Sequence, residues 1–319
     1  FGATDGACGR YEHDRFSYNR NRELVVFIML LRTLINEARQ TVSTLYPEGE
    51  ASGMVFALFE HLLGTKRHTH IVEPSYDVSA ESVKLVEAAL ERLAAGEPLQ
   101  YVIGSACFYG RDFKVSPSVL IPRPETEILC RTAIEYFSGH RDVRVLDMCT
   151  GSGCIAWTMA LECPGAEVVA VDISDDALHV ASSQDFVEEM KRTGALAPTF
   201  LKADVLADVP SGDIFERRFD MILSNPPYVM NKEKSLMRAN VLEHEPHLAL
   251  FVSDDDPLVF YRAVARWASA LLSPDGTGLV EINEALGPET AQVYLDAGFR
   301  STEVLQDFSG RDRFVSFRR

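Results

Sequence analysis

Apolar and polar positions follow a helical spacing over the first third of the chain. From about Arg22 to Ala95 the apolar residues recur every three or four positions, as in "ASGMVFALFEHLL", and β-branched runs are scarce. The apolar run "LVVFIMLL" at Leu24 to Leu31 is too short to cross a bilayer, and no small-residue cleavage site follows it. We therefore expect a buried helix there, within a small helical domain over residues 1–95.

The pattern changes twice after this region. Gly96 and Pro98 interrupt the helical spacing, and "LQYVIGSACFYGRDFKVSPSVLIP" has the character of short strands around a glycine-containing turn. This predicts a hairpin linker over residues 96–122. Beyond it, helical patterns alternate with the strand-like runs "VRVLDM", "EVVAVDI", "TFLKAD", "FDMILS" and "TGLVEIN".

Strands that are apolar on both faces and separated by helices predict a parallel sheet covered on both sides. We therefore expect residues 123–319 to form an α/β domain with a Rossmann-like, doubly wound sheet. The late segments "STEVLQD" and "RFVSFRR" could supply a terminal antiparallel pair of strands.

Composition narrows the possible partners. The 319 residues carry a formal net charge of −16, which argues against a surface that wraps nucleic acid, because phosphate binding needs clustered Lys and Arg. The cysteines show neither CxxC pairs nor dense spacing, which favours a reducing, cytoplasmic location over a disulfide framework or a zinc site. They are Cys8, Cys107, Cys130, Cys149, Cys154 and Cys163. We expect no metal and no membrane partner.

A glycine-containing loop follows the strand that ends near Asp147. In "VLDMCTGSGCIA", Gly151 and Gly153 stand between a strand and a helix, where they allow the backbone to approach a ligand closely at the first crossover of the sheet. An ordinary tight turn is the alternative, and Ala156 takes the last position of a GxGxxG pattern. The loop is a candidate nucleotide site because acids follow the next two strands.

Those acids are Asp172, after "VVAV", and Asp204, before Val205. Asp172 is placed to accept hydrogen bonds from both hydroxyls of a ribose, although an acid at a strand end is also a common helix N-cap. Asp204 could equally be a solvated loop acid, and with Val205 it would bound an adenine by a polar edge and an apolar wall. Together the three strand ends predict a nucleoside pocket.

The fourth strand end carries the most specific motif. In "FDMILSNPPYV" two prolines, which cannot donate to a sheet ladder, end the strand after Leu223 and stiffen the loop beyond it. The Asn225 side chain and the Pro226 carbonyl offer two acceptors suited to a planar NH₂ group, Pro227 adds to the stiffness of the loop, and Tyr228 supplies an aromatic wall. A proline-terminated strand with a surface tyrosine would explain the prolines alone.

These motifs resemble a known family. "NPPY" with "LDMCTGSGCIA" and "AVDIS" resembles the amino-group branch of the class I S-adenosylmethionine-dependent methyltransferases, which includes DNA adenine and protein glutamine enzymes. Further segments make the chain similar to the release-factor glutamine methyltransferases, the PrmC or HemK-type family, from about Gly96 to the C-terminus. They are "GEPLQYVIG", "LIPRPETE", "EHEPHLAL", "EIN" and "DFSGRDRFV".

The resemblance implies S-adenosylmethionine as the cofactor. The family's cofactor loop falls on Cys149, Thr150, Gly151, Ser152 and Gly153, its ribose acid on Asp172, further cofactor contacts on Asp204, Val205 and Asn225, and its substrate motif on Asn225, Pro226, Pro227 and Tyr228. Cys149 replaces the more usual glycine of the loop, and "SSQDF" replaces a common Asn-Ala pair after the ribose acid.

The activity implied by the resemblance is methyl transfer to the side-chain amide nitrogen of the glutamine in the GGQ loop of a peptide-chain release factor. Catalysis would rest on Asn225, Pro226 and Tyr228, which hold and orient a poor nucleophile, without a dedicated general base. The enzyme is expected to be a monomer. One alternative is a DNA adenine methyltransferase, against which the acidic composition counts. The other is a non-catalytic cofactor-binding protein, against which the intact "NPPY" counts.

Overall fold

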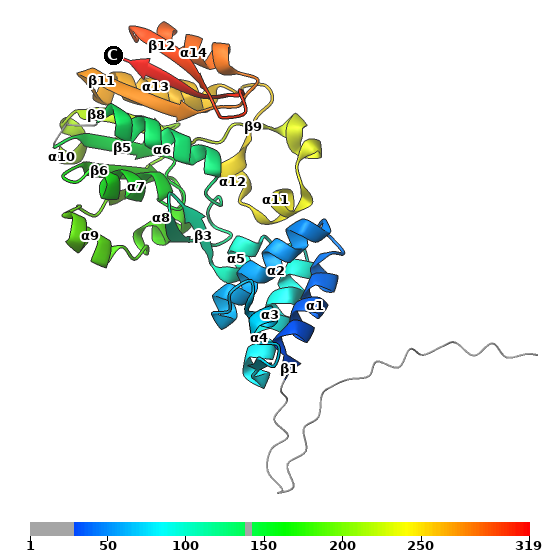
Figure 1. Ribbon diagram of the computed structural model, residues 1–319. Helices are drawn as coiled ribbons and strands as arrows, with labels where there is room; N and C mark the ends of the chain where they lie inside the picture. The colour runs from blue at the N-terminus through cyan, green and yellow to red at the C-terminus, as the bar shows by residue number, and fades with distance from the viewer. Residues whose placement is uncertain (1–28, 138–141) are drawn as a thin grey trace, which may run out of the picture. The chain divides into compact units, whose positions relative to one another are not determined.

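The computed structural model describes residues 29–137 and 142–319. They divide between Ile103 and Gly104 into two compact units, the first helical and the second built on a central sheet (Figure 1). None of the helices within the described ranges is both long and apolar enough to cross a membrane.

The first unit packs helices around one apolar core. Its elements are β1 (Met29–Leu30), α1 (Leu31–Val42), α2 (Glu48–Leu63), α3 (Thr69–Val72), β2 (Asp77–Val78), α4 (Ala80–Ala94) and α5 (Leu99–Ile103). The core side chains come mainly from α1, α2 and α4, whose buried positions recur three or four residues apart, as in Leu31, Leu34 and Ile35. Ser79 caps α4, since its hydroxyl accepts a hydrogen bond from the Ser82 N–H at 3.1 Å.

The structure bears on two of the elements predicted for this part of the chain. The run Leu24 to Leu31 lies mostly outside the described residues, as does the predicted start of the helices near Arg22; within the described part, Met29 and Leu30 form a short strand before α1. The expected strand character of "LQYVI" is wrong, because Leu99–Ile103 form α5. A short apolar run without a polar alternation fits either structure, and here Tyr101 is buried on a single helical turn.

The second unit begins with a hairpin of β3 (Ser105–Phe108) and β4 (Arg111–Lys114). Its turn residues Tyr109 and Gly110 both have positive φ angles, of 51° and 73°, as a tight two-residue hairpin turn requires. The buried side chains of Phe108 and Phe113 join the core of this unit. The hairpin is therefore packed as an integral part of the second unit.

The central sheet has seven strands in the order β12-β13-β11-β8-β5-β6-β7. The parallel strands β5 (Arg144–Met148), β6 (Glu167–Asp172), β7 (Thr199–Lys202), β8 (Phe219–Ser224) and β11 (Leu272–Glu281) confirm the predicted alternation. The terminal pair β12 (Ser301–Gln306) and β13 (Asp312–Arg318) is also present, and β13 runs antiparallel to both of its neighbours. The α/β, Rossmann-like fold is confirmed.

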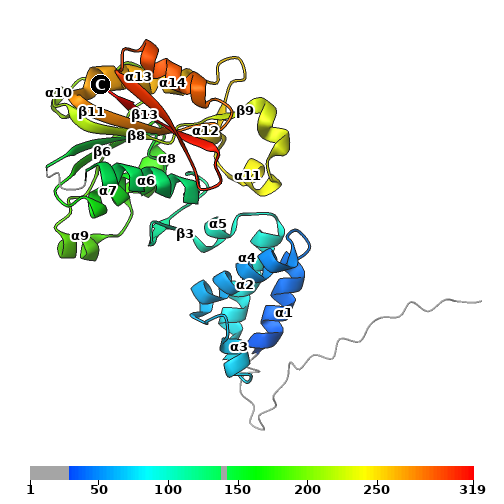
Figure 2. The same cartoon turned by 45° about the horizontal axis from the view of Figure 1, so that its top comes forward.

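Helices cover both faces of this sheet, as Figure 2 shows. One face packs against α6 (Pro124–Tyr136) and α7 (Cys154–Glu162), and the other against α13 (Val259–Leu271) and α14 (Gly287–Asp296). Neighbouring residues of β5 alternate between the two cores: Val145 belongs to the first and Leu146 to the second. This arrangement leaves the carboxyl ends of the parallel strands free to form a site.

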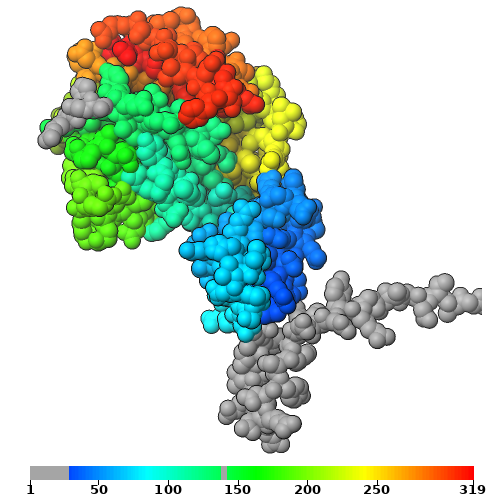
Figure 3. Space-filling view, in the orientation of Figure 1, coloured from blue at the N-terminus to red at the C-terminus, as the bar shows by residue number. Residues whose placement is uncertain are grey.

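The remaining elements lie around the sheet, and those from β9 to β10 follow the carboxyl end of β8. They are α8 (Asp175–Ser182), α9 (Val187–Thr193), α10 (Asp213–Glu216), β9 (Val229–Met230), the 3₁₀ helix η1 (Asn231–Leu236), α11 (Ala239–His244), α12 (His247–Leu250) and β10 (Phe251–Val252). Residues 231–250, yellow in Figure 3, lie on the surface of the second unit. The short parallel pair of β9 and β10 joins the two ends of this segment.

Candidate active site

A cavity of about 420 Å³ lies at the carboxyl ends of β5, β6, β7 and β8. This is the edge of an open α/β sheet at which ligands bind, and the volume falls in the range of small-molecule sites. The cavity brings together nine of the residues that the sequence singled out: Cys149, Thr150, Gly151, Ser152, Asp172, Asp204, Val205, Asn225 and Pro227. Gly153, Pro226 and Tyr228 are outside its lining.

The loop after β5 adopts an unusual backbone conformation. Cys149, Gly151 and Gly153 have positive φ angles of 62°, 54° and 79°, a region that glycine enters freely and other residues seldom enter. A Cβ on Gly151 would meet nothing within 4 Å, whereas one on Gly153 would lie 3.0 Å from Ala181 Cβ of α8. Gly153 thus serves close helix packing, and Gly151 leaves the cavity open.

Asp172 links the first two strand ends. Its Oδ2 accepts a hydrogen bond from the Gly151 N–H at 2.9 Å, and its Oδ1 accepts one from the Ser174 N–H at 3.0 Å. Burial raises the pKa of the Asp172 carboxyl above its ordinary value, although these backbone hydrogen bonds act in the opposite direction. Each oxygen keeps a further lone pair, so the carboxylate can still accept hydrogen bonds from a ligand.

The third strand end forms another part of the wall. Val205 is buried, and Asp204 is exposed with its Oδ1 accepting a hydrogen bond from the Leu206 N–H at 2.8 Å. Ile173 and Leu206 also line the cavity and are about half exposed. Apolar side chains with one acidic edge therefore surround this part of the cavity.

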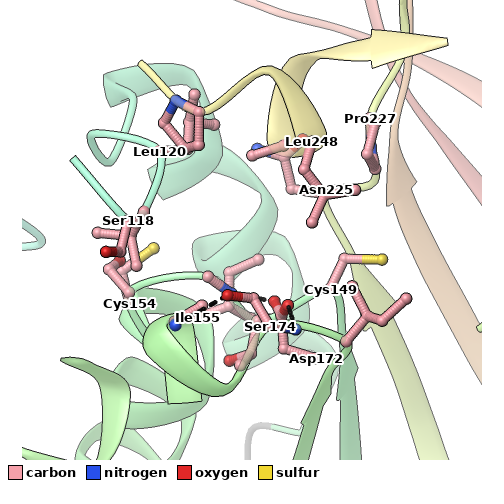
Figure 4. Close-up of a pocket in the computed structure, with 18 of the residues that line it drawn as sticks. Ser118, Leu120, Cys149, Cys154, Ile155, Asp172, Ser174, Asn225, Pro227 and Leu248 are labelled. Atoms are coloured by element: carbon pink, nitrogen blue, oxygen red, sulfur yellow. Dashed lines mark hydrogen bonds between the residues drawn. The ribbon is translucent and has the colours of Figure 1, made fainter. Parts of the chain in front are cut away.

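The fourth strand ends as the proline pair predicts, with β8 stopping at Ser224. The Ser224 hydroxyl donates to the Met148 carbonyl at 2.7 Å and so ties the start of the "NPPY" loop to β5. In Figure 4, Asn225 and Leu248 lie across the cavity from Asp172 and Ser174. The Tyr228 side chain is anchored behind the loop, where its hydroxyl donates to Glu281 Oε1 at 3.0 Å.

Two buried residues behind this loop were not predicted as site residues. The Thr126 hydroxyl donates to Glu281 Oε2 at 2.7 Å and accepts a hydrogen bond from Asn225 Nδ2 at 3.2 Å. Glu281 is only 1% exposed, and burial raises its pKa although the hydrogen bonds from Thr126 and Tyr228 lower it. The strings "PRPETE" and "EIN" contain these two residues, but nothing in the sequence indicates that they meet.

Two further side chains, Glu245 and Gln184, hold segments at the rim of the cavity through hydrogen bonds. Glu245, which is 3% exposed, accepts hydrogen bonds from the Arg123 guanidinium at 2.6 Å and from the Ile121 N–H at 3.2 Å. Gln184 of the "SSQDF" stretch donates to the Ser152 carbonyl at 3.1 Å, and its Oε1 accepts from the Lys114 N–H at 2.8 Å. The "SSQDF" stretch thus supplies a bond to the loop after β5.

Asp147 is fully buried beneath the same loop. Its Oδ2 accepts a hydrogen bond from the Thr150 hydroxyl at 2.5 Å, and burial raises its pKa from 3.8 to about 7. The contact holds the loop onto the end of β5. Asp147 does not belong to the cavity lining, so its role is to shape the loop.

Family models match both parts of the chain. The model described as PrmC N-terminal domain matches residues 33–104, and the model described as Methyltransferase small domain matches residues 126–249, which include the loop, the acids and "NPPY". Fold and site together define a class I S-adenosylmethionine-dependent methyltransferase, so the predicted enzyme class and cofactor are confirmed.

Curated relatives narrow the class further. The release factor glutamine methyltransferase of Bacteroides thetaiotaomicron is 38% identical over 88% of this chain and 97% of its own length. The enzyme of the same name from Flavobacterium psychrophilum is 36% identical over 90% of this chain and 98% of its own. The chain belongs to the release factor glutamine methyltransferase family, as predicted, and these relatives do not favour the DNA adenine alternative.

A solved structure of a protein-(glutamine-N5) methyltransferase (release factor-specific) from Alicyclobacillus acidocaldarius is 28% identical. It covers 65% of this chain and 99% of its own, with a TM-score of 0.38.

Proposed function

We propose that this methyltransferase transfers the methyl group of S-adenosylmethionine to the side-chain amide nitrogen of the glutamine in the GGQ loop of a peptide-chain release factor. The observation that carries the proposal is the position of Asn225. Its side chain borders the same cavity as Asp172 and the glycine loop, so an amide held by Asn225 would lie beside a cofactor held by the other two.

The residues present fit the cofactor. Asp172 has free lone pairs for two ribose hydroxyls, and the absence of a Cβ on Gly151 leaves room beside them. We propose that Cys149, Thr150, Ser152 and Gly153 hold the rest of the cofactor through the loop backbone. Val205 and Asp204 would bound the adenine, with Asn225 closing the site on the substrate side.

The bound cofactor supplies an electrophilic methyl on a sulfonium centre. An amide nitrogen is a poor nucleophile because its lone pair is delocalised into the carbonyl, so orientation must supply much of the acceleration. We propose that Asn225 Oδ1 and the Pro226 carbonyl accept hydrogen bonds from the two amide hydrogens. These acceptors also stabilise the positive charge that develops on the nitrogen.

Pro227 and Tyr228 would act by holding that geometry. Pro227 lines the cavity and stiffens the backbone, and the Tyr228 hydroxyl is tied to Glu281. We therefore propose that Tyr228 supports the loop from outside the cavity lining, and that Tyr228→Phe reduces the rate only modestly. No general base is required, since the proton can leave to water after transfer.

Recognition of the intact release factor would fall to the helical region. We propose that the predicted helical domain, whose described part ends at Ile103, makes this contact, and that the hairpin expected as a linker within residues 96–122 belongs to the catalytic unit. The net charge of −16 favours a protein partner over nucleic acid. We further propose a monomeric, cytoplasmic enzyme, in keeping with the free cysteines at all five described positions.

The experiment is methyl transfer with labelled S-adenosylmethionine, offered separately to a release factor, to the same factor with its GGQ glutamine changed to Glu, and to duplex DNA. Label should enter only the unchanged release factor. Asn225→Ala should lower kcat by roughly 100-fold, about the loss from removing one orienting hydrogen-bond acceptor in a transition state, while cofactor affinity changes little. Label in DNA, or transfer at the wild-type rate by Asn225→Ala, would refute the proposal.

A further inference from the structure

The buried hydrogen bonds behind Asn225 determine which way its amide faces. Thr126, on α6, is 2% exposed and Glu281, at the end of β11, is 1% exposed; both oxygens of Glu281 accept hydrogen bonds. One comes from Thr126 and the other from Tyr228. Asn225 then contacts the Thr126 hydroxyl through its Nδ2, at 3.2 Å.

The direction of these bonds follows from the chemistry of the groups. With Glu281 ionised, its carboxylate can only accept, so the single hydroxyl hydrogen of Thr126 must point at Glu281. The Thr126 oxygen then has only lone pairs left for Asn225, and the Asn225 side chain must present its NH₂ group to them. Its carbonyl oxygen Oδ1 is consequently the group left to face a ligand.

We propose that Glu281 and Thr126 are positioning residues that lock the Asn225 amide with its oxygen toward the cavity, so that the site accepts an NH₂ donor and rejects a carboxylate. The inference rests on the proposed function and adds to it the source of the selectivity for glutamine over glutamate. Glu281 does not line the cavity and acts through Thr126. Unlocked, the amide could turn over at small cost, because its two ends have nearly the same size.

Three substitutions separate positioning from packing. Thr126→Val keeps the shape but removes the hydroxyl, and Thr126→Ser keeps the hydroxyl and serves as the matched control. Glu281→Gln is nearly isosteric, yet its amide can donate to Thr126, which allows the Thr126 hydrogen to turn to Asn225 and the Asn225 NH₂ group to face the cavity.

The readout is the ratio of the inhibition constant of the Glu form to KM for the unchanged release factor, which falls when the site binds the Glu form better. For each variant, KM for the release factor is compared with the inhibition constant of the same factor carrying Glu at the GGQ position. In the wild-type enzyme the Glu form should bind poorly, because its carboxylate meets an acceptor. In Thr126→Val and Glu281→Gln we expect kcat to fall by roughly 10- to 100-fold and the ratio to shift at least about tenfold toward the Glu form. Thr126→Ser should stay near the wild type in both.

Each outcome has one meaning. Affinity for S-adenosylmethionine and tryptophan fluorescence establish that a variant is folded, and Thr126→Val carries the test if Glu281→Gln does not fold. If Thr126→Val and Glu281→Gln lower kcat but leave the ratio unchanged, the two residues only support the fold, and the positioning role is overturned. It is also overturned if both variants behave like the wild type while Asn225→Ala is inactive. Full activity of Asn225→Ala would instead refute the proposed function, and the inference with it.

Discussion

Replacing Gly153 with Ala tests why the loop after β5 needs glycine at this position. Gly153 precedes α7 with φ of 79° and ψ of 11°, and an added Cβ would lie 3.0 Å from Ala181 Cβ and 3.2 Å from Trp157 Cδ1. Gly194, at the end of α9, has nearly the same angles, 76° and 15°, with nothing within 4 Å of an added Cβ. The two sites therefore share the conformational cost and differ in the space available.

The magnitudes follow from these two contributions. Placing an alanine in the left-handed region costs about 1–2 kcal/mol at either site. At Gly153 overpacking adds about 1–3 kcal/mol, since Ala181 Cα, a backbone atom, is also only 3.3 Å away and cannot yield as a flexible side chain would. We expect Gly194→Ala to lower the free energy of unfolding by about 1–2 kcal/mol and Gly153→Ala by about 2–5 kcal/mol.

Urea denaturation followed by tryptophan fluorescence measures this difference. Both tryptophans of the chain, Trp157 and Trp267, lie in the second unit, so the signal reports on that unit. Combining Gly153→Ala with Ala181→Gly should recover part of the extra cost in a double-mutant cycle, because the nearest clashing atom is then absent. Affinity for S-adenosylmethionine should fall in Gly153→Ala but not in Gly194→Ala. Equal destabilisation of the two single variants would show that the close approach to α8 is not what requires glycine.

Three further predictions concern the same loop and its neighbours. Asp172→Ala should weaken S-adenosylmethionine binding by roughly 1.5–3 kcal/mol in calorimetry, and unchanged affinity would refute the ribose assignment. Burial raises the pKa of Asp147 from 3.8 to about 7, so the folded state binds this proton more tightly and the free energy of unfolding should fall as pH rises from about 4 through about 7. Asp147→Asn should flatten this dependence in urea titrations. The same dependence of the unfolding free energy on pH in both proteins would contradict the prediction. Burial raises the pKa of the Cys149 and Cys154 thiols, to about 12 for Cys154. Among the five cysteines that the structure describes, iodoacetamide at about pH 8 should therefore label exposed Cys107 first in peptide mass spectrometry, and early labelling of Cys149 would show that the thiol is not protected.

The sequence was sufficient for the sheet because its strands carry a strong local signal. Runs such as "FDMILS", bounded by polar or proline residues, are apolar on both faces, and the strand found at Phe219–Ser224 corresponds to that run. The segment Leu99–Ile103 was misassigned because five residues are too few to distinguish a helical period from a strand. Local pattern therefore predicted elements well only where they were long or sharply bounded.

The cavity was predicted where it depends on strand ends, since parallel strands bring their carboxyl ends to one edge. The network behind it was not, because Thr126 and Glu281 are 155 residues apart and meet only through the packing of α6 against β11. Their side chains have no local pattern that marks them as partners. Sequence reasoning thus located Asn225 but not the residues that orient it.

The order of the sheet has a consequence for biosynthesis. Strand β13, the last of the sheet to be made, lies between β12 and β11, and its Val315 and Phe317 are fully buried in the second core. While a ribosome is still producing the chain, β12 has no neighbour to pair with and β11 has one open edge. A nascent chain can assemble the parallel strands first, but this edge of the sheet stays open until synthesis has passed Arg318 and β13 has emerged. Termination of synthesis before Asp312 would therefore leave out an interior strand and leave exposed edges that invite aggregation.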